Sequence, residues 1–277
     1  MLSLMQRITR RLLEQTLPQI ISRPSLAHLN EQLALLALRG LGVGNFGGQD
    51  ERRFLRRFKE GAGPVPTIID VGANVGHYSE YLLILMPQAR IIAIEPHPGN
   101  FRRLFDRLNS RAVLLNTAIG STPGRTTLFD YATSGSDLAT SVPGVLEEVF
   151  TDFSHGSSVS VEVPVTTLDD IIEEHELPRV DLLKIDVEGL EIEVLKGAGK
   201  SLSQNKILCI QFEFNLHNAY VHTLFRDFVQ LLPGFSFGRI CLSGDVLPLD
   251  PLSYPLSELF YYQNIVATRP GRTSIKR

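Results

Sequence analysis

An apolar strand, a glycine turn and a helix follow one another between residues 67 and 86, and this order constrains the fold more than any other feature of the chain. Gly72 and Gly76 bracket the turn, where glycine permits positive φ and close approach of the backbone to a ligand. The helix stops before a proline, and a second apolar run, residues 90–94, follows and finishes in Glu95. The segment therefore predicts two parallel strands joined by a helix.

The acid that ends the second strand predicts a nucleoside site. Glu95 stands nineteen positions after Gly76, where a carboxylate at the tip of the neighbouring strand can accept both ribose hydroxyls. The turn has neither the Gly-x-Gly-x-x-Gly pattern of a dinucleotide site nor the Gly-x-x-x-x-Gly-Lys pattern of a triphosphate site. Asp70 precedes the glycines instead, and an acid there suits a cofactor with a cationic amino-acid end. S-Adenosylmethionine fits, with Asp70 near its ammonium or sulfonium and Glu95 at its ribose.

A second segment, residues 181–191, reads Asp-Leu-Leu-Lys-Ile-Asp-Val-Glu-Gly-Leu-Glu and carries five ionisable groups. Its apolar residues predict a parallel strand covered on both faces, where an unpaired charge is costly to desolvate. Lys184 and Asp186 project from the same face of such a strand. They can form a structural ion pair, or together face a ligand at the end of the strand. Glu188 and Glu191 are expected at the start of the following helix, where acids favour the helix dipole.

These segments together resemble the FkbM-type S-adenosylmethionine-dependent methyltransferases. The resemblance covers roughly residues 35 to 267, and the Lys-Ile-Asp-Val-Glu-Gly-x-Glu block at 184–191 is its most specific part. It rests also on 70–79, on Ile-Glu-Pro at 94–96 and on 163–171. The resemblance implies a class I methyltransferase fold and methylation of a hydroxyl on a sugar, glycan or natural-product small molecule.

The residues expected to bind the cofactor lie in the glycine turn, at the start of its helix and at neighbouring strand ends. They are Asp70, Gly72, Ala73, Asn74, Gly76, Tyr78, Ser79, Glu95, Asn116 and Asp186. The resemblance implies that the strand end carrying Asn116 lies near the adenine. The residues expected to act on the acceptor are Lys184, Asp186, Glu213 and His217. His217 is a candidate base, although a histidine at a helix start is also often merely exposed.

Several alternatives remain open on these residues. Asp186, Glu213 and Asn215 offer hard oxygen ligands, so Mg²⁺ could bind there and acidify an acceptor hydroxyl. An acid or amide could equally bind the acceptor directly. A nicotinamide-dependent oxidoreductase would explain the strand–helix–strand unit and the ribose acid, but the second closely spaced glycine is missing from the turn. A non-catalytic cofactor-binding protein would keep the turn without the acceptor-side residues.

The expected architecture is one domain, residues 61–270, with a helical extension at 1–60 and a disordered tail at 271–277. Alternating strands and helices predict a seven-stranded, mostly parallel sheet with helices on both faces and a reversed final strand at 260–268. Residues 121–159 are rich in turn formers and predict an irregular segment, which either carries acceptor specificity or is an ordinary mobile loop. A strand is expected at residues 113–118.

Composition excludes some partners. A net charge of −3 and a pI near 6.2 offer no general attraction for nucleic acid, so none is expected as a partner. The two cysteines have no Cys-x-x-Cys spacing and the chain shows no secretory leader, which favours a reducing, cytoplasmic location. Oligomeric state is not predicted.

The first sixty residues carry ten Lys/Arg and five Asp/Glu. Apolar and basic positions alternate near the start, so a helix that contacts a membrane surface fits, but packing on the chain's own domain is the more common outcome. No apolar run reaches the length of a membrane span. The glycine-rich stretch at 40–48 is expected to act as a hinge or a substrate lid.

Overall fold

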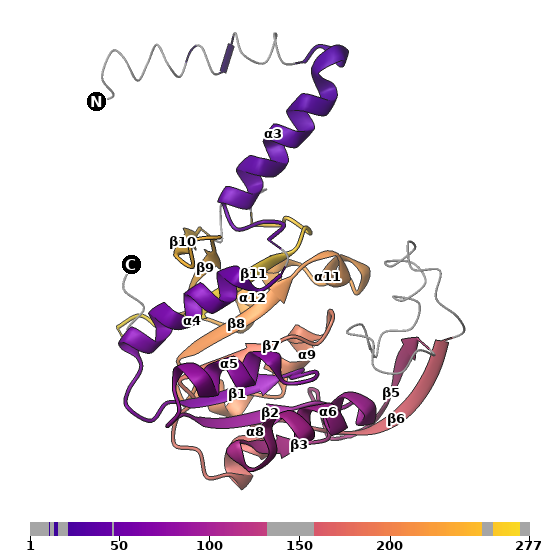
Figure 1. Cartoon of the computed structure of the whole chain (residues 1–277), viewed down its shortest axis with the longest axis vertical. Coiled ribbons are helices and arrows are strands. Elements are labelled where there is room, and N and C mark those ends of the chain that lie inside the picture. Colours follow the sequence, from indigo (N-terminus) through magenta and orange to yellow (C-terminus); the bar gives the residue numbers. More distant parts are fainter. Residues whose placement is uncertain are drawn as a thin grey trace.

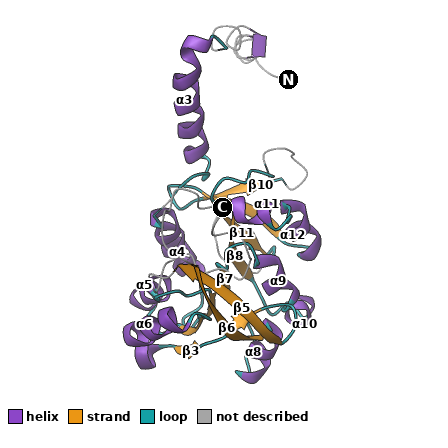
Figure 2. Ribbon diagram, turned by 90° about the vertical axis from the view of Figure 1, so that its right-hand side faces the viewer, coloured by secondary structure: helices purple, strands orange, loops and turns teal. Residues whose placement is uncertain are grey.

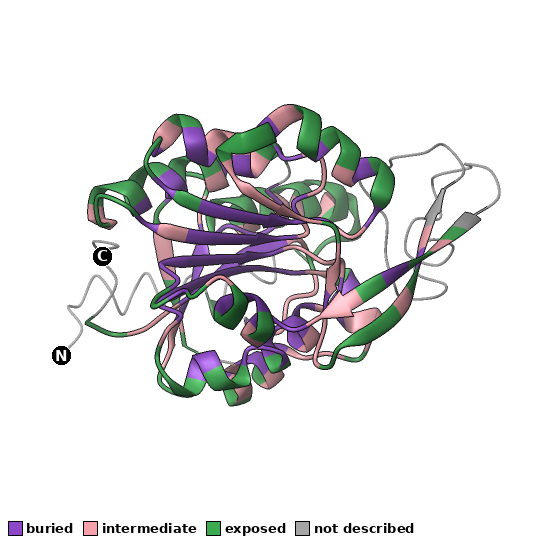
Figure 3. Ribbon diagram, turned by 90° about the horizontal axis from the view of Figure 1, so that it is seen from below, coloured by how far each residue is buried: buried purple, intermediate pink, exposed green. Residues whose placement is uncertain are grey.

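The computed structural model describes residues 11, 14–15, 22–45, 47–131, 158–250 and 257–271. In this part of the chain, an eight-stranded sheet lies between layers of helices, and a three-stranded sheet stands at one side (Figures 1 and 3). The prediction of a mostly parallel sheet with helices on both faces is confirmed.

The main sheet has the strand order β10-β9-β11-β8-β7-β1-β2-β3. Its strands are β1 (Thr67–Val71), β2 (Arg90–Ile94), β3 (Val113–Leu115), β7 (Leu182–Ile185), β8 (Cys209–Phe214), β9 (Ser236–Ile240), β10 (Val246–Leu249) and β11 (Gln263–Thr268). Neighbours from β3 to β8 pair in parallel, whereas β11 runs antiparallel between β8 and β9 as expected. The described part of the main sheet has eight strands rather than the predicted seven, because β10 pairs with β9 at the edge. Pro248 obscured this strand in the sequence, since proline is tolerated in edge strands.

Helices cover both faces of the main sheet. They are α4 (Gln49–Gly61), α5 (His77–Leu85), α6 (Pro98–Leu108), α8 (Leu168–Glu174), α9 (Glu191–Lys196), α10 (Gly199–Ser203), α11 (Leu216–Tyr220) and α12 (Phe225–Leu231), with a short 3₁₀ turn at Asn109–Arg111 after α6; a second 3₁₀ turn, Pro24–Leu26, precedes α3 (Ala27–Gly40). Phe54 of α4, Leu82 of α5 and Leu104 of α6 belong to the hydrophobic cluster on one face. Ile171 of α8 and Phe228 of α12 belong to the cluster on the other face. None of the described helices is long and apolar enough to cross a membrane.

A polar stripe crosses the face of the sheet that α4 and α5 cover. In register, Asp70 on β1 stands beside Lys184 on β7, and Lys184 stands beside Gln211 on β8. Residues two apart on a strand share a face. Ile68, two residues before Asp70, and Leu182, two residues before Lys184, pack in the hydrophobic cluster that includes residues of α4 and α5. The three polar side chains therefore point toward these helices.

The small sheet departs most from expectation. It has the order β4-β6-β5, formed by β4 (Ala118–Ile119), β5 (Gly124–Tyr131) and β6 (Ser158–Thr166). β5 and β6 pair antiparallel and project beyond the main sheet (Figure 3). The expected irregular loop at 121–159 is therefore wrong at both of its ends, where the chain is regular strand, while residues 132–157 lie outside the described part.

The expected strand at 113–118 also divides between the two sheets. β3 ends at Leu115 in the main sheet, and Ala118 begins β4 in the small one. Asn116 and Thr117 lie at the break, and the hydroxyl of Thr117 donates to the carbonyl oxygen of Pro164 at 3.0 Å. The break turns the chain from one sheet into the other.

The N-terminal helices have different surroundings. α4 packs on the sheet through Phe54, Leu55 and Phe58. α3 (Ala27–Gly40) has no buried residue and extends away from the rest of the described chain (Figures 1 and 2). Its leucines at 29, 33 and 36 are 54, 54 and 61% exposed. Residues 1–10 of the expected helical extension and 272–277 of the expected tail lie outside the described residues.

Residues 42–44, in the glycine-rich stretch between these helices, pack against the end of the main sheet. Val43 is buried and forms an antiparallel bridge with Gln263. The backbone N–H of Gly44 donates to the carbonyl oxygen of Tyr262 at 2.6 Å. Gly42 has a φ of 83° and packs against Ile240. The same glycines that permit motion also permit this close packing, so the hinge or lid stays a prediction.

Candidate active site

A cavity opens where β1, β2 and β7 end, and it has about 770 Å³ of empty space, part of it continuous with solvent. The described lining consists of Val71, Gly72, Asn74, Ile94, Glu95, Pro96, Asn100, Thr117, Ala118, Ile119, Leu128, Asp186, Val187, Glu188 and Leu190. In open parallel sheets, ligands bind at this carboxyl edge of the strands.

The glycine turn forms the floor of the cavity. Gly72 has a φ of 80°, and a Cβ on it would overlap the carbonyl oxygen of Asp186. The N–H groups of Gly72 and Ala73 both donate to the carbonyl oxygen of Ile94 at 2.9 Å. Gly76, with a φ of 87°, stands at the start of α5. The turn therefore holds the ends of three strands together, and only Gly72 and Asn74 of its residues line the cavity.

Glu95 reaches the cavity from the end of β2. Its Oε2 accepts the backbone N–H of Asn74, and its Oε1 accepts the backbone N–H of His97, both at 2.8 Å. Burial raises the pKa of its carboxyl to about 7, against these two hydrogen bonds, which lower it. Each carboxylate oxygen has a second lone pair that can accept a ligand hydroxyl.

Asn116 supports the cavity wall from behind. Its Nδ2 donates to the carbonyl oxygens of Glu95 at 2.8 Å and of Pro96 at 3.0 Å. The cavity lining includes Thr117 but not Asn116. Asn116 therefore fixes the loop after β2, and its contact with the cofactor stays a prediction.

Three other residues expected at the cofactor are also placed behind the wall. Asp70 is 1% exposed and its Oδ2 accepts the hydroxyl of Ser79 at 2.6 Å. Burial raises the pKa of Asp70 to about 6. The hydroxyl of Tyr78 donates to Gln211 Oε1 at 2.8 Å. Tyr78 and Ser79 lie there because the first turn of α5 faces the polar stripe of the sheet rather than its edge.

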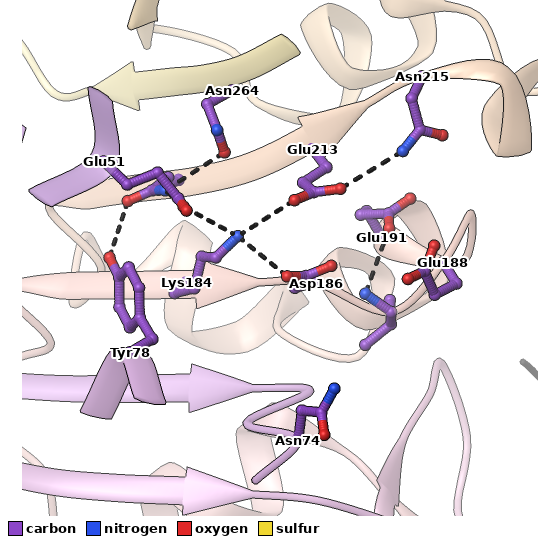
Figure 4. A network of polar contacts seen from close by, with 12 residues as sticks. Glu51, Asn74, Tyr78, Lys184, Asp186, Glu188, Glu191, Glu213, Asn215 and Asn264 are labelled. Atoms are coloured by element: carbon purple, nitrogen blue, oxygen red, sulfur yellow. Dashed lines mark hydrogen bonds and ion pairs between the residues drawn. The ribbon is translucent and has the colours of Figure 1, made fainter. Parts of the chain in front are cut away.

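Lys184 lies at the centre of a buried carboxylate cluster (Figure 4). Its Nζ is 3.3 Å from Asp186 Oδ2, 3.4 Å from Glu51 Oε1 and 3.9 Å from Glu213 Oε1, and its side chain is 3% exposed. Burial alone would lower its pKa, but the carboxylates of Asp186, Glu51 and Glu213 raise it above its usual value. Lys184 therefore stays charged, and of these residues only Asp186 also lines the cavity.

Glu213 is held within the same cluster. The hydroxyl of Tyr262 donates to its Oε1 at 2.8 Å, and Asn215 Nδ2 donates to its Oε2 at 3.4 Å. Burial first, and then the charge of Asp186, raise the pKa of Glu213 well above its usual value. Neither Glu213 nor Lys184 reaches the cavity lining.

His217 is paired with Glu188 at the edge of the cavity. Its Nδ1 lies 2.6 Å from Glu188 Oε2, and its side chain is 8% exposed. Asn215 positions it, since the backbone N–H of His217 donates to Asn215 Oδ1 at 2.8 Å. Burial opposes a charge on His217, but Glu188 holds its pKa above the usual value. His217 itself is behind the lining, which Glu188 reaches.

The Mg²⁺ alternative gains no support. Among the described residues, no group of three or more His, Cys, Asp or Glu side chains is arranged to hold a metal ion. The lysine ammonium of residue 184 lies where a cation among Asp186 and Glu213 would have to bind.

Sequence reasoning missed Glu51 and Gln211, and it gave Glu188 a different role. Glu51 comes from α4, 133 positions before the lysine it neutralises, and its Oε1 also accepts Gln211 Nε2. Glu188 is not in a helix: it has a φ of 54° in the turn before α9. Only Glu191 begins the helix as expected, and its Oε1 accepts the N–H of Gly189 at 3.1 Å. The glycine at 189 was the available signal of a sharp turn.

Comparison with known proteins places the chain among methyltransferases. A family model described as Methyltransferase FkbM domain matches residues 70–239. Methyltransferase sdnD of Sordaria araneosa is 33% identical over 48% of this chain and 60% of its own length. 2-O-methyltransferase NoeI of Sinorhizobium fredii is 28% identical over 66% of this chain and 79% of its own. Hexuronic acid methyltransferase AglP of Haloferax volcanii is 27% identical over 58% of this chain and 62% of its own length. The chain thus spans less than two thirds of sdnD and AglP.

Proposed function

Because the chain belongs to the FkbM methyltransferase family, we propose that it transfers a methyl group from S-adenosylmethionine to a hydroxyl of a sugar, glycan or other small molecule. The observation that carries this proposal is the cavity at the ends of β1, β2 and β7. Gly72, Glu95 and Asp186 reach it from three neighbouring strand ends, which is where nucleoside cofactors bind in such sheets.

The residues of the cavity fit the proposed cofactor. Glu95 has lone pairs for ribose hydroxyls, and Asp186 offers a negative charge to an ammonium or sulfonium group. Ile94, Ile119 and Leu128 supply apolar surface for a base. When bound, S-adenosylmethionine supplies a methyl carbon activated by its sulfonium. The protein then has to align the acceptor oxygen with that carbon and receive a proton.

Behind the lining, the Lys184 cluster fixes Asp186. An ion pair to Lys184 holds Asp186 Oδ2 at 3.3 Å, and Gly72 packs under its carbonyl oxygen. Lys184 and Glu213 are therefore proposed to position the site, rather than to touch the acceptor as the sequence predicted.

The activities named for two relatives support a hydroxylated acceptor. One is a 2-O-methyltransferase and one acts on a hexuronic acid. Residues 61–270 are proposed as the catalytic domain together with α4, because α4 supplies Glu51 to the cluster. A cytoplasmic location is part of the proposal, supported by the free thiols of Cys209 and Cys241.

Calorimetric titration with S-adenosylhomocysteine tests the function. Wild-type protein should bind this thioether with micromolar affinity, and Glu95→Ala should weaken binding at least about tenfold, because the ribose loses its acceptor. Glu173→Gln, an exposed acid on α8, serves as the matched control and should bind normally. Binding of NAD in preference to the thioether would contradict the proposal and favour an oxidoreductase.

A further inference from the structure

Glu188 occupies an unusual position for an acid that merely starts a helix. It has a φ of 54°, a backbone conformation that non-glycine residues seldom adopt and that is concentrated at functional sites. It lines the cavity together with Asp186 and Val187, and Figure 4 shows it in the turn that follows the strand carrying Lys184. The turn thus places a carboxylate in the cavity wall at a cost in backbone energy.

Contacts from two other elements hold Glu188 in this place. His217, at the start of α11, lies 2.6 Å from its Oε2 through Nδ1. Gly189, with a φ of 103°, packs against His217, so that an added Cβ would lie 3.1 Å from the Cβ of that histidine. Glu191 also fixes this turn, because its Oε1 accepts the N–H of Gly189 and its Oε2 accepts Asn218 Nδ2. One oxygen of Glu188 is thereby engaged, and the carboxylate still faces the cavity.

We propose that Glu188, positioned by His217, binds the acceptor hydroxyl and receives its proton, and that the acceptor is a neutral hydroxyl compound. The inference rests on the proposed function. The acceptor oxygen forms a bond to the methyl carbon while the bond from that carbon to sulfur breaks, and sulfur keeps the electron pair as a neutral thioether. The hydroxyl proton passes to the Glu188 carboxylate and then to solvent at the open side of the cavity.

The charge of the wall sets the acceptor class. Glu95, Asp186 and Glu188 are acids, and the described lining contains no lysine, arginine or histidine. A carboxylate on the acceptor would face like charges without a counterion, which disfavours binding. His217 lies behind Glu188 and is neutralised by it. A neutral sugar hydroxyl can instead donate to the carboxylate of Glu188, while Glu95 and Asp186 serve the cofactor.

The test compares methyl glycosides of neutral hexoses with methyl glycosides of hexuronic acids as acceptors, after S-adenosylhomocysteine binding has been measured for each protein. Glu188→Gln keeps the shape of the side chain but not its basicity, so turnover of neutral glycosides should fall about 100-fold to 1,000-fold. Its affinity for the thioether should stay within about threefold. Glu193→Gln on α9 is the matched control and should match wild type.

Two variants of His217 test whether this residue positions Glu188 for catalysis or only contributes to packing. His217→Asn retains an N–H near the place of Nδ1 and should keep most of kcat, whereas His217→Leu should lower kcat about tenfold without weakening thioether binding. The pH profile of kcat is then measured for wild type, both His217 variants and Glu188→Gln, all of which keep the neighbouring charges of Asp186, Lys184, Glu191 and Glu213. The fall of kcat at low pH should disappear only in Glu188→Gln.

The outcomes separate this inference from the proposed function. If wild type does not bind the thioether, the methyltransferase function itself fails. If wild type binds it but Glu188→Gln methylates neutral glycosides at the normal rate, Glu188 is not the base. If wild type prefers hexuronides, or methylates none of the neutral glycosides, the acceptor class is wrong.

Discussion

Gly72 packs directly beneath the carbonyl oxygen of Asp186, at a distance that leaves no room for a side-chain atom. The contact joins the turn after β1 to the end of β7. Gly72 therefore fixes the position of these two parts of the cavity lining relative to each other. Position 72 needs glycine for two reasons: its φ is positive, and the carbonyl oxygen of Asp186 lies too close for a side chain.

Gly72→Ala should therefore damage both fold and site. A Cβ would push Asp186 away and strain the backbone, which should lower the free energy of unfolding by about 2–4 kcal/mol. Thioether binding should weaken by more than about tenfold. Urea unfolding and calorimetry measure the two effects. Gly124→Ala, at a position with open space, should change neither; similar behaviour of the two variants would contradict the contact.

Removing the buried lysine should leave its carboxylates uncompensated. Lys184→Met should lower the free energy of unfolding by about 3–5 kcal/mol at pH 7. Adding Glu51→Gln to this variant should recover part of the loss, because one buried negative charge disappears with the lysine. Urea unfolding of the single and double variants gives the comparison. A double variant no more stable than Lys184→Met would show that Glu51 does not depend on the lysine.

Cofactor binding should depend on pH through Glu95. Its pKa is raised to about 7 by burial, so the ionised form that accepts two ribose hydroxyls is lost as pH falls through this value. Thioether affinity should be about tenfold weaker at pH 6 than at pH 8. In Glu95→Gln the affinity should be weaker at both pH values and nearly independent of pH. Equal slopes in the two proteins would mean that another group controls binding.

Tyr78 should matter for stability and not for the cofactor. Its hydroxyl donates to the buried Gln211, so Tyr78→Phe leaves an acceptor without this donor and should cost about 1–2 kcal/mol in unfolding free energy. Thioether affinity should stay within about threefold of wild type. A large loss of affinity without a loss of stability would restore the original prediction that Tyr78 contacts the cofactor.

The leucines of α3 should contribute little to folding of the domain. Exchange of Leu29, Leu33 and Leu36 for glutamine removes side chains that are more than half exposed and should change the unfolding free energy by less than about 0.5 kcal/mol. Leu55→Ala on α4, whose side chain is 1% exposed, should cost about 2–5 kcal/mol. If the triple variant unfolds as easily as Leu55→Ala, α3 packs on the domain.

The local parts of this fold were predictable from sequence, and the parts set by distant contacts were not. Gly72, Gly76 and Glu95 mark a turn and a strand tip by their spacing, so the cavity could be located before the structure. Small residues before β6 look like a loop, although valine occupies every second position from 159 to 165, as in a strand. Glu51 has no local signal, because its role depends on how α4 crosses the sheet.

α4 also determines how this domain can be moved between proteins. The family model begins at residue 70, after the helix that carries Glu51, Phe54 and Leu55. A chain trimmed to the family match would uncover one apolar face of the sheet and remove a counterion from Lys184. A fused or shortened form of this domain must therefore include the helix at residues 49–61.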